Sequence, residues 1–181
     1  ANADMIINIS ASPFGDDRLI ERSNLIQEKV QKTGLPFIYC NLVGSQDELI
    51  FDGQSLVYDH DANLIAKGKA FSEDLLIVDF EESSKIELNA MQREESLYRA
   101  LSLGVKDYFS KTGHSQAVIG LSGGIDSCLT ACVAVEALGR ENVHGISMPS
   151  KFSSDHSISD AEMLAKNIGI DYREIPIHSI V

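Results

Sequence analysis

The chain is poor in the residues that mark several classes of protein. Its 181 residues include three cysteines, four prolines and no tryptophan, and 15 basic residues stand against 27 acidic ones, a formal net charge of −12. Cys40, Cys128 and Cys132 lack the spacing of metal ligands, and we interpret them as buried thiols. Because no cluster of lysine and arginine offsets the acidic charge, nucleic acid is not expected as a partner.

Long apolar runs and paired histidines are absent as well. The longest apolar runs reach only about ten residues, too few to cross a bilayer, and the first residues lack the pattern of a secretion signal. We therefore expect a cytoplasmic protein with no membrane partner. The histidines do not have the spacing of zinc ligands, so no zinc site is expected. They are His60, His114, His144, His156 and His178.

What is present predicts an α/β protein in two parts. Residues 1–80 have the pattern of a sheet-rich domain, with strands at 5–9, 37–43, 49–58, 63–66 and 75–80 and one helix at 18–33. A linker without periodicity is predicted at 81–93. Residues 94–181 then alternate, with helices at 94–112, 127–138 and 157–168 and strands at 118–121, 143–148 and 172–177. Such alternation predicts a parallel sheet covered by helices.

The most informative stretch lies where the strand at 118–121 runs into the next helix. Its sequence is IGLSGGIDS, at 119–127. Glycines allow the backbone to approach an anion, serines add hydroxyl donors, and the amides at a helix N-terminus attract negative charge. Asp126 has a reason to face phosphates if Mg²⁺ lies between them, since this cation takes oxygen ligands from both sides. The lysine of a P-loop is missing, so this is a different phosphate loop.

A structural explanation of the same stretch stays open. A serine- and glycine-rich turn can simply cap a helix, with Asp126 placed in the first turn where a negative charge favours the helix dipole. The strand before the turn and the helix after it are the context that a phosphate loop requires, which favours the functional interpretation.

Longer motifs extend the resemblance to a family. The stretch SGGIDS resembles the signature of the ATP pyrophosphatases, and together with MPSKFSSDHSISDA at 148–161 and NIGIDY at 167–172 it resembles the synthetase domain of NAD⁺ synthetases. The earlier segments INISASPF at 7–14 and NLVGSQDELIFDG at 41–53 resemble the later part of a nitrilase-type glutamine amidase. In this order, the two parts are similar to glutamine-dependent NAD⁺ synthetases.

The resemblance implies a fold and a reaction. Residues 1–80 would be part of a nitrilase-like α/β sandwich, and residues 94–181 the start of a parallel-sheet ATP-pyrophosphatase domain. Glutamine would supply ammonia, ATP with Mg²⁺ would adenylylate deamido-NAD⁺, and ammonia would displace AMP to give NAD⁺, with pyrophosphate released in the first step. Family members are homo-oligomers, so association is expected.

The resemblance also assigns residues. The ATP and pyrophosphate site would comprise Ser122, Gly123, Gly124, Ile125, Asp126, Ser127, Met148, Lys151, Ser153 and Ser154. Asp126 would be the Mg²⁺ ligand, while Met148 is equally well explained as a core residue. Ser12 and Arg18 match positions that hold glutamine, although Arg18 could instead be a solvated residue at the start of a helix.

The catalytic residues of the glutaminase are not expected in this chain. The family's Glu, Lys and Cys triad has no counterpart here, because Cys40 does not match its nucleophile. Both halves look incomplete, so we expect an internal piece of a longer protein that is inactive alone. Two alternatives stay open: another ATP pyrophosphatase with a different acceptor, and a non-catalytic remnant that serves as a binding or assembly module.

Overall fold

The computed structural model describes residues 3–151 and 153–177, so Phe152 and His178 lie outside the described residues. The chain forms two compact units, residues 1–104 and 105–181. Helix α2 (Arg93–Thr112) begins in the first unit and ends in the second. Each unit is described below by itself.

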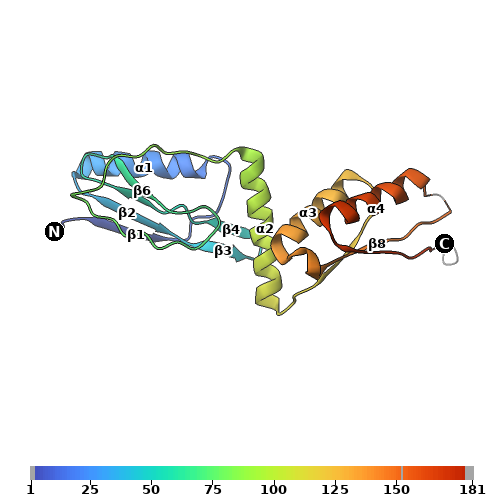
Figure 1. Cartoon of the computed structure of the whole chain (residues 1–181). Helices are drawn as coiled ribbons and strands as arrows, with labels where there is room; N and C mark the ends of the chain where they lie inside the picture. The colour runs from blue at the N-terminus through green and yellow to red at the C-terminus, as the bar shows by residue number, and fades with distance from the viewer. Residues whose placement is uncertain (1–2, 152, 178–181) are drawn as a thin grey trace. The chain divides into compact units, whose positions relative to one another are not determined.

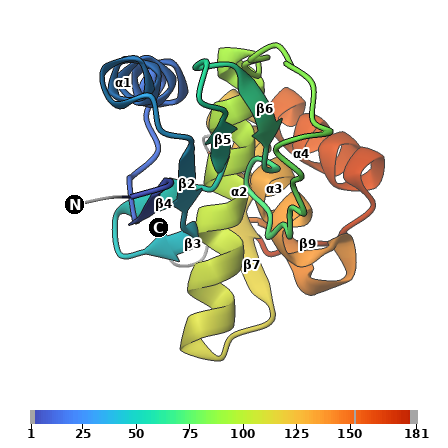
Figure 2. The same cartoon turned by 90° about the vertical axis from the view of Figure 1, so that its left-hand side faces the viewer.

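The first unit is built on a four-stranded sheet in the order β1-β2-β5-β6. The strands are β1 (Ile6–Ser10), β2 (Phe37–Asn41), β5 (Leu56–Tyr58) and β6 (Leu64–Lys67). β1 and β2 are parallel, as their connection through α1 (Arg18–Thr33) allows, and the remaining pairs are antiparallel. In Figures 1 and 2, α1 lies along one face of this sheet.

The core of the first unit lies between α1 and the sheet. The apolar residues of α1 recur at helical spacing, and they pack against the side chains of β2, β5 and β6. Tyr58 is fully buried, and its hydroxyl lies 2.6 Å from Ser23 Oγ on α1. Burial raises the pKa of Tyr58, so the phenol stays neutral and the pair joins helix and sheet.

Two details of the predicted strands are wrong. The expected strand at 49–58 is interrupted after β4 (Leu49–Asp52), because Gly53 and Gln54 both have positive φ. β4 pairs instead with β3 (Val43–Gln46) in a separate hairpin. Residues 75–80 form no strand, because their backbone pairs with none of the strands, and Leu75 is 87% exposed.

The predicted linker at 81–93 follows the surface of the first unit. The Ile86 amide donates to the Leu64 carbonyl at 2.8 Å, and Lys67 Nζ donates to the Asn89 carbonyl at 2.9 Å. Leu88 packs against the core. These contacts hold an irregular segment beside β6.

The second unit confirms the predicted alternation of strands and helices. Its parallel sheet has the order β7-β8-β9, and α3 and α4 lie on one side of it (Figure 1). The elements are β7 (Ala117–Gly120), α3 (Ile125–Leu138), the 3-10 turn η1 (Arg140–Asn142), β8 (Val143–Ser147), α4 (Asp155–Ile168) and β9 (Asp171–Glu174). The carboxyl ends of β7 and β8 therefore lie side by side, where parallel sheets bind ligands.

Small residues allow the two helices to approach the sheet. Ala131 and Ala134 of α3 and Ala161 and Ala165 of α4 are buried in one cluster. At Gly145, an added Cβ would lie 2.6 Å from Leu121 Cδ1, so a side chain there would force the Leu121 side chain to shift. The packing thus depends on residues with little or no side chain.

The thiols are not buried as we expected. Cys40 is exposed, while Cys128 and Cys132 are half-buried on α3. The stripe of alanines, rather than the cysteines, faces the sheet. No helix in residues 3–151 and 153–177 is both long and apolar enough to span a membrane.

The burial of Leu56 generates a test of the first unit's core. Leu56 is fully buried, so Leu56→Ala should lower the free energy of unfolding of this unit by about 2–5 kcal/mol. Leu75→Ala removes the same atoms from a side chain that is 87% exposed and should change it by less than about 0.5 kcal/mol. Denaturant titration measures both. Equal losses would show that this core is misplaced.

Candidate functional site

The loop that is predicted to bind phosphate lies between β7 (Ala117–Gly120) and α3 (Ile125–Leu138). Leu121 is buried and its amide donates to the Ile146 carbonyl at 2.8 Å, which extends the sheet pairing by one residue into the loop. α3 begins at Ile125, two residues earlier than predicted, with Gly124 as its N-cap in an extended conformation. The first-turn amides of α3 have no partner inside the helix and are available to an anion.

Gly123 fixes the shape of this loop. Its φ is +76°, a conformation that residues with a Cβ rarely adopt, and an added Cβ would lie 2.4 Å from the Ser157 carbonyl oxygen. The loop therefore packs directly on the backbone of the first turns of α4. Both conditions require glycine at this position.

The loop is preorganised by its own hydroxyls. Ser127 Oγ donates to the Gly124 carbonyl at 2.9 Å and accepts from the Ser122 amide at 3.3 Å. Ser122 Oγ lies 3.1 Å from Ser127 Oγ and accepts from the Gly124 amide at 3.3 Å. Both serines thus hold the turn together while the loop stays open to solvent on its outer side. The predicted serines are adjacent, as a phosphate cradle requires.

Asp126 lies in the first turn of α3 with an exposed side chain. Among the described residues there is no group of three or more His, Cys, Asp or Glu side chains that could form a complete metal site. A single carboxylate, that of Asp126, fits Mg²⁺, because proteins hold this ion by one or two carboxylates together with substrate phosphates and water. It does not fit a metal enclosed by protein ligands alone.

A pocket of about 440 Å³ opens beside the loop, at the carboxyl ends of β7 and β8. Its walls bring together four of the predicted site residues, Ser122, Met148, Ser153 and Ser154. Met148 is 51% exposed, so the explanation of this residue as core is wrong. The pocket lies between the loop 122–127 and the segment 148–154, two stretches that are far apart in sequence.

The remaining residues of that segment shape its turn. Ser153 Oγ accepts from the Ser150 amide at 2.9 Å, and Ser154 Oγ caps α4 by accepting from the Ser157 amide at 3.2 Å. Lys151 and His156 are exposed, on either side of these serines. The N-termini of α3 and α4 therefore meet near one pocket.

Sequence reasoning missed two serines that line this pocket. Ser147 is buried at the end of β8 and lines the pocket, and Ser157 supplies the carbonyl against which Gly123 packs. The alternation of β8 places Ser147 on the same face as Val143, a signal that could have identified it. The role of Ser157 could not be read from the sequence, since it depends on how the loop and α4 approach.

The residues predicted to bind the substrate glutamine, Ser12 and Arg18, lie at the loop that follows β1. Arg18 is exposed, and its guanidinium pairs with Glu21 at 3.0 Å. An added Cβ at Gly15 would lie 3.0 Å from Arg18 Cγ, so the stem of Arg18 folds over this loop. Ser12 is half-buried and is held by Arg22 and Asn41. Sequence reasoning missed both of these partners.

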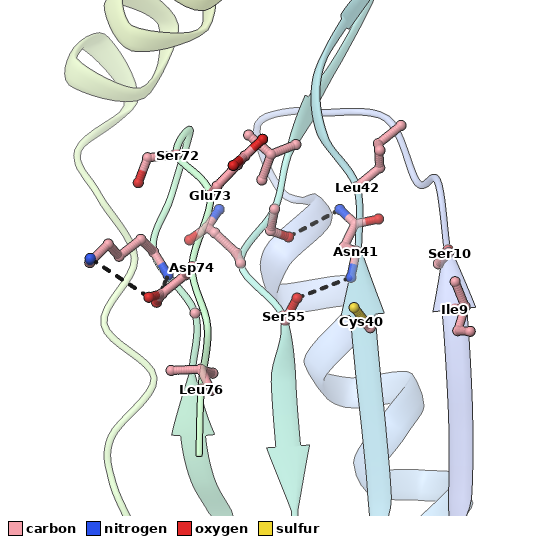
Figure 3. A pocket seen from close by; sticks show the side chains of 15 residues that line it. Ile9, Ser10, Cys40, Asn41, Leu42, Ser55, Ser72, Glu73, Asp74 and Leu76 are labelled. Carbon is pink, nitrogen blue, oxygen red and sulfur yellow. Dashed lines mark hydrogen bonds and ion pairs between the residues drawn. The ribbon is translucent and has the colours of Figure 1, made fainter. Parts of the chain in front are cut away.

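A second pocket, of about 450 Å³, lies on the first unit between the ends of β1 and β2 and the segment 68–76 (Figure 3). Cys40 and Asn41 of β2 line it, and Lys69 pairs with Asp74 at 3.6 Å on its other side. The backbone amide of Asn41 donates to Ser55 Oγ at 3.0 Å. No histidine or lysine of the described residues is paired with the Cys40 thiol, so this pocket has no activated nucleophile.

Comparisons with known proteins show which proteins the chain resembles. The model of the family described as NAD synthase matches residues 97–181. Through these residues the chain is similar to the NAD synthase family. Over 98% of its length the chain is 46% identical to the glutamine-dependent NAD⁺ synthetase of Synechocystis sp., and over 99% it is 38% identical to that of Aquifex aeolicus. It covers 33% and 38% of those proteins, so it spans about a third of the length of the curated relatives that it matches.

Solved structures show the same similarity. The glutamine-dependent NAD⁺ synthetase of Acinetobacter baumannii, in complex with ADP, superposes with a TM-score of 0.90 and 33% identity, over 98% of this chain and 35% of that chain. The enzyme of Cytophaga hutchinsonii has a TM-score of 0.83 at 22% identity, over 98% of this chain and 37% of that chain, which shows the fold alone. Both units therefore occur together, in this order, in the relatives.

The fit of Gly123 against α4 generates a second test. Gly113 also has a positive φ, of +74°, but open space around its Cβ position, so Gly113→Ala measures the backbone cost alone, about 1–2 kcal/mol. Gly123→Ala should lower the free energy of unfolding of the second unit by about 1–3 kcal/mol more, because the methyl group collides with the Ser157 backbone. Equal losses in the two variants would argue against the close approach.

Proposed function

We propose that this chain is part of an enzyme that makes NAD⁺ from deamido-NAD⁺, ATP and ammonia drawn from glutamine. The observation that carries the proposal is the loop 122–127, preorganised between two helix N-termini and beside a pocket at the strand ends. The ADP bound to the similar Acinetobacter baumannii enzyme supports a nucleotide as the ligand.

The chain's residues would act on the phosphates of ATP. The amides of the first turn of α3 and the hydroxyl of Ser122 would bind the phosphates that leave as pyrophosphate and stabilise the charge that develops there. Ser127, whose proton goes to the Gly124 carbonyl, would hold the loop in the shape that binds them. Asp126 would hold Mg²⁺, which would neutralise phosphate charge and orient the leaving group. Met148, Lys151, Ser153 and Ser154 would border the rest of the nucleotide. A carboxylate is a poor acyl donor. Once it is adenylylated, AMP is a good leaving group, which ammonia can displace.

Glutamine would bind to the first unit. We assign its α-carboxylate to Ser12 and Arg18, of which Arg18 has the fork-shaped donor set that suits a carboxylate. Cys40 would not be the nucleophile, since it has no activating partner among the described residues. Association into homo-oligomers and a cytoplasmic location remain predictions. Similarity over both units favours this function over another ATP pyrophosphatase or a non-catalytic remnant.

The role of Asp126 can be tested in the intact protein that carries this chain. Asp126→Asn keeps the size of the side chain but removes the charge that binds Mg²⁺, and should reduce ammonia-supported NAD⁺ formation about 100-fold or more. Glutamine hydrolysis should be unchanged. Asp160→Asn, on an exposed position of α4, is the matched control and should leave both rates unchanged. Unaltered ATP-dependent rates in Asp126→Asn would refute the ligand assignment.

The role of Arg18 can be tested by comparing two nitrogen sources. Arg18→Ala should raise the KM for glutamine about tenfold or more, the loss of one charged hydrogen bond, while synthesis from free ammonia stays nearly constant. Glu21→Ala removes the ion-pair partner of Arg18 and serves as control, with little effect on either. The clamp would be the wrong assignment if glutamine- and ammonia-supported rates fell alike, or if both variants behaved alike.

A further inference from the structure

Ser12 is held by buried side chains at all three of its polar groups. Its amide donates to Asn41 Oδ1 at 2.9 Å. Its hydroxyl oxygen accepts from Arg22 Nε at 3.2 Å, and its carbonyl accepts from Arg22 Nη2 at 3.1 Å and from Asn41 Nδ2 at 3.3 Å. A loop residue on the surface is thus bonded as completely as a residue inside a sheet.

The guanidinium of Arg22 is itself immobilised. Arg22 is only 6% exposed, and its Nη1 donates to both carboxylate oxygens of Asp52, at 2.9 and 3.2 Å. Asp52 is 1% exposed and accepts a further bond from Gln54 Nε2 at 2.7 Å. Nη2 of Arg22 also donates to the Pro13 carbonyl at 3.0 Å. Each edge of the planar fork is therefore occupied, so that its orientation is determined by the fold.

This geometry determines the direction of the hydrogen bond to Ser12. The Nε of arginine is always a donor, so the Ser12 hydroxyl must accept from it and its own proton points elsewhere. No other group of the described residues takes that proton. A hydroxyl that accepts from a cation becomes a stronger donor, because hydrogen bonds in a chain polarise one another. Ser12 is thus prepared to donate to an anion and not to accept from an ammonium group.

We propose that Arg22, fixed by Asp52, is a positioning residue that orients the Ser12 hydroxyl as a donor to the α-carboxylate of glutamine. The inference rests on the proposed function, in which Ser12 and Arg18 bind that carboxylate. Arg18 folds over the same loop on its exposed side. Arg22, one helical turn later, is buried and donates to the Ser12 and Pro13 carbonyls of this loop. The two arginines therefore have different tasks: Arg18 contacts the substrate, and Arg22 acts through Ser12.

The test uses the intact protein and a substrate pair, glutamine and its α-carboxamide, glutaminamide, which has no carboxylate. Arg22→Lys keeps the positive charge beside Asp52 but has no Nε donor for Ser12. It should raise the KM for glutamine about tenfold, as expected when a hydrogen bond to a charged group is weakened. The KM for glutaminamide and the ammonia-supported rate should change less than about twofold. Arg99→Lys, an exposed arginine paired with Glu95, is the matched control and should change none of these values.

A double-mutant cycle separates positioning from a general structural role. If Arg22 acts through the Ser12 hydroxyl, the variant with both Arg22→Lys and Ser12→Ala should be no worse than Ser12→Ala alone. Additive losses, or equal losses with glutamine and glutaminamide, would overturn the proposal. If Ser12→Ala leaves the KM for glutamine unchanged, the assignment of glutamine to Ser12 fails instead, which is a failure of the proposed function.

A measurement on the unaltered protein covers the case in which Arg22→Lys does not fold. With labelled arginine, the Nε–H signal of the buried Arg22 can be followed by NMR and assigned by its change in Ser12→Ala. Saturating glutamine should shift this signal, because the Ser12 hydroxyl acquires an anionic acceptor, and glutaminamide should shift it much less. The same shift with both ligands, or no shift with either, would count against the proposal.

Discussion

The shape of the loop 122–127 depends on one close contact, that of Gly123 with the backbone of α4. Because no Cβ intervenes, the turn after β7 can take a left-handed conformation and lie directly on the first turns of the neighbouring helix. This contact brings the N-termini of α3 and α4 together beside the pocket. The serines of the loop then hold a shape that the glycine makes accessible.

In the first unit, a buried ion pair holds the loop that follows a strand. Its loop after β1 is held by a buried ion pair, Arg22 with Asp52, whose remaining donors and acceptors are all used. A buried pair of this kind is costly to desolvate and adds little net stability, but losing one partner leaves an uncompensated charge. The pair fixes the Arg22 guanidinium, which donates to the Ser12 hydroxyl oxygen. In both units, a loop at the end of a strand is held by hydrogen bonds where a ligand is proposed to bind.

The two units differ in how much of their structure was predictable from local pattern. The alternation of strands and helices in the second unit was predicted correctly, because each element there has a strong period and parallel sheets join such elements in order. In the first unit, residues 75–80 have strand composition but form no strand. The expected strand at 49–58 breaks at Gly53 and Gln54, which belong to a left-handed turn. Strand pairing requires a partner edge, which no local pattern contains.

The sequence alone predicted the loop 122–127 and its place between strand and helix, because these depend on residues that are neighbours along the chain. The tertiary structure decided which distant residues complete the sites. Ser147 and Met148 reach the loop across the sheet, and Ser157 meets Gly123 through the packing of α4. Arg22, a charged residue within a helix, has the pattern of a solvated side chain, and only the fold buries it against Asp52, 30 residues away. The physical reason is that burial and long-range contact are properties of the packed chain, while period and turn chemistry are local.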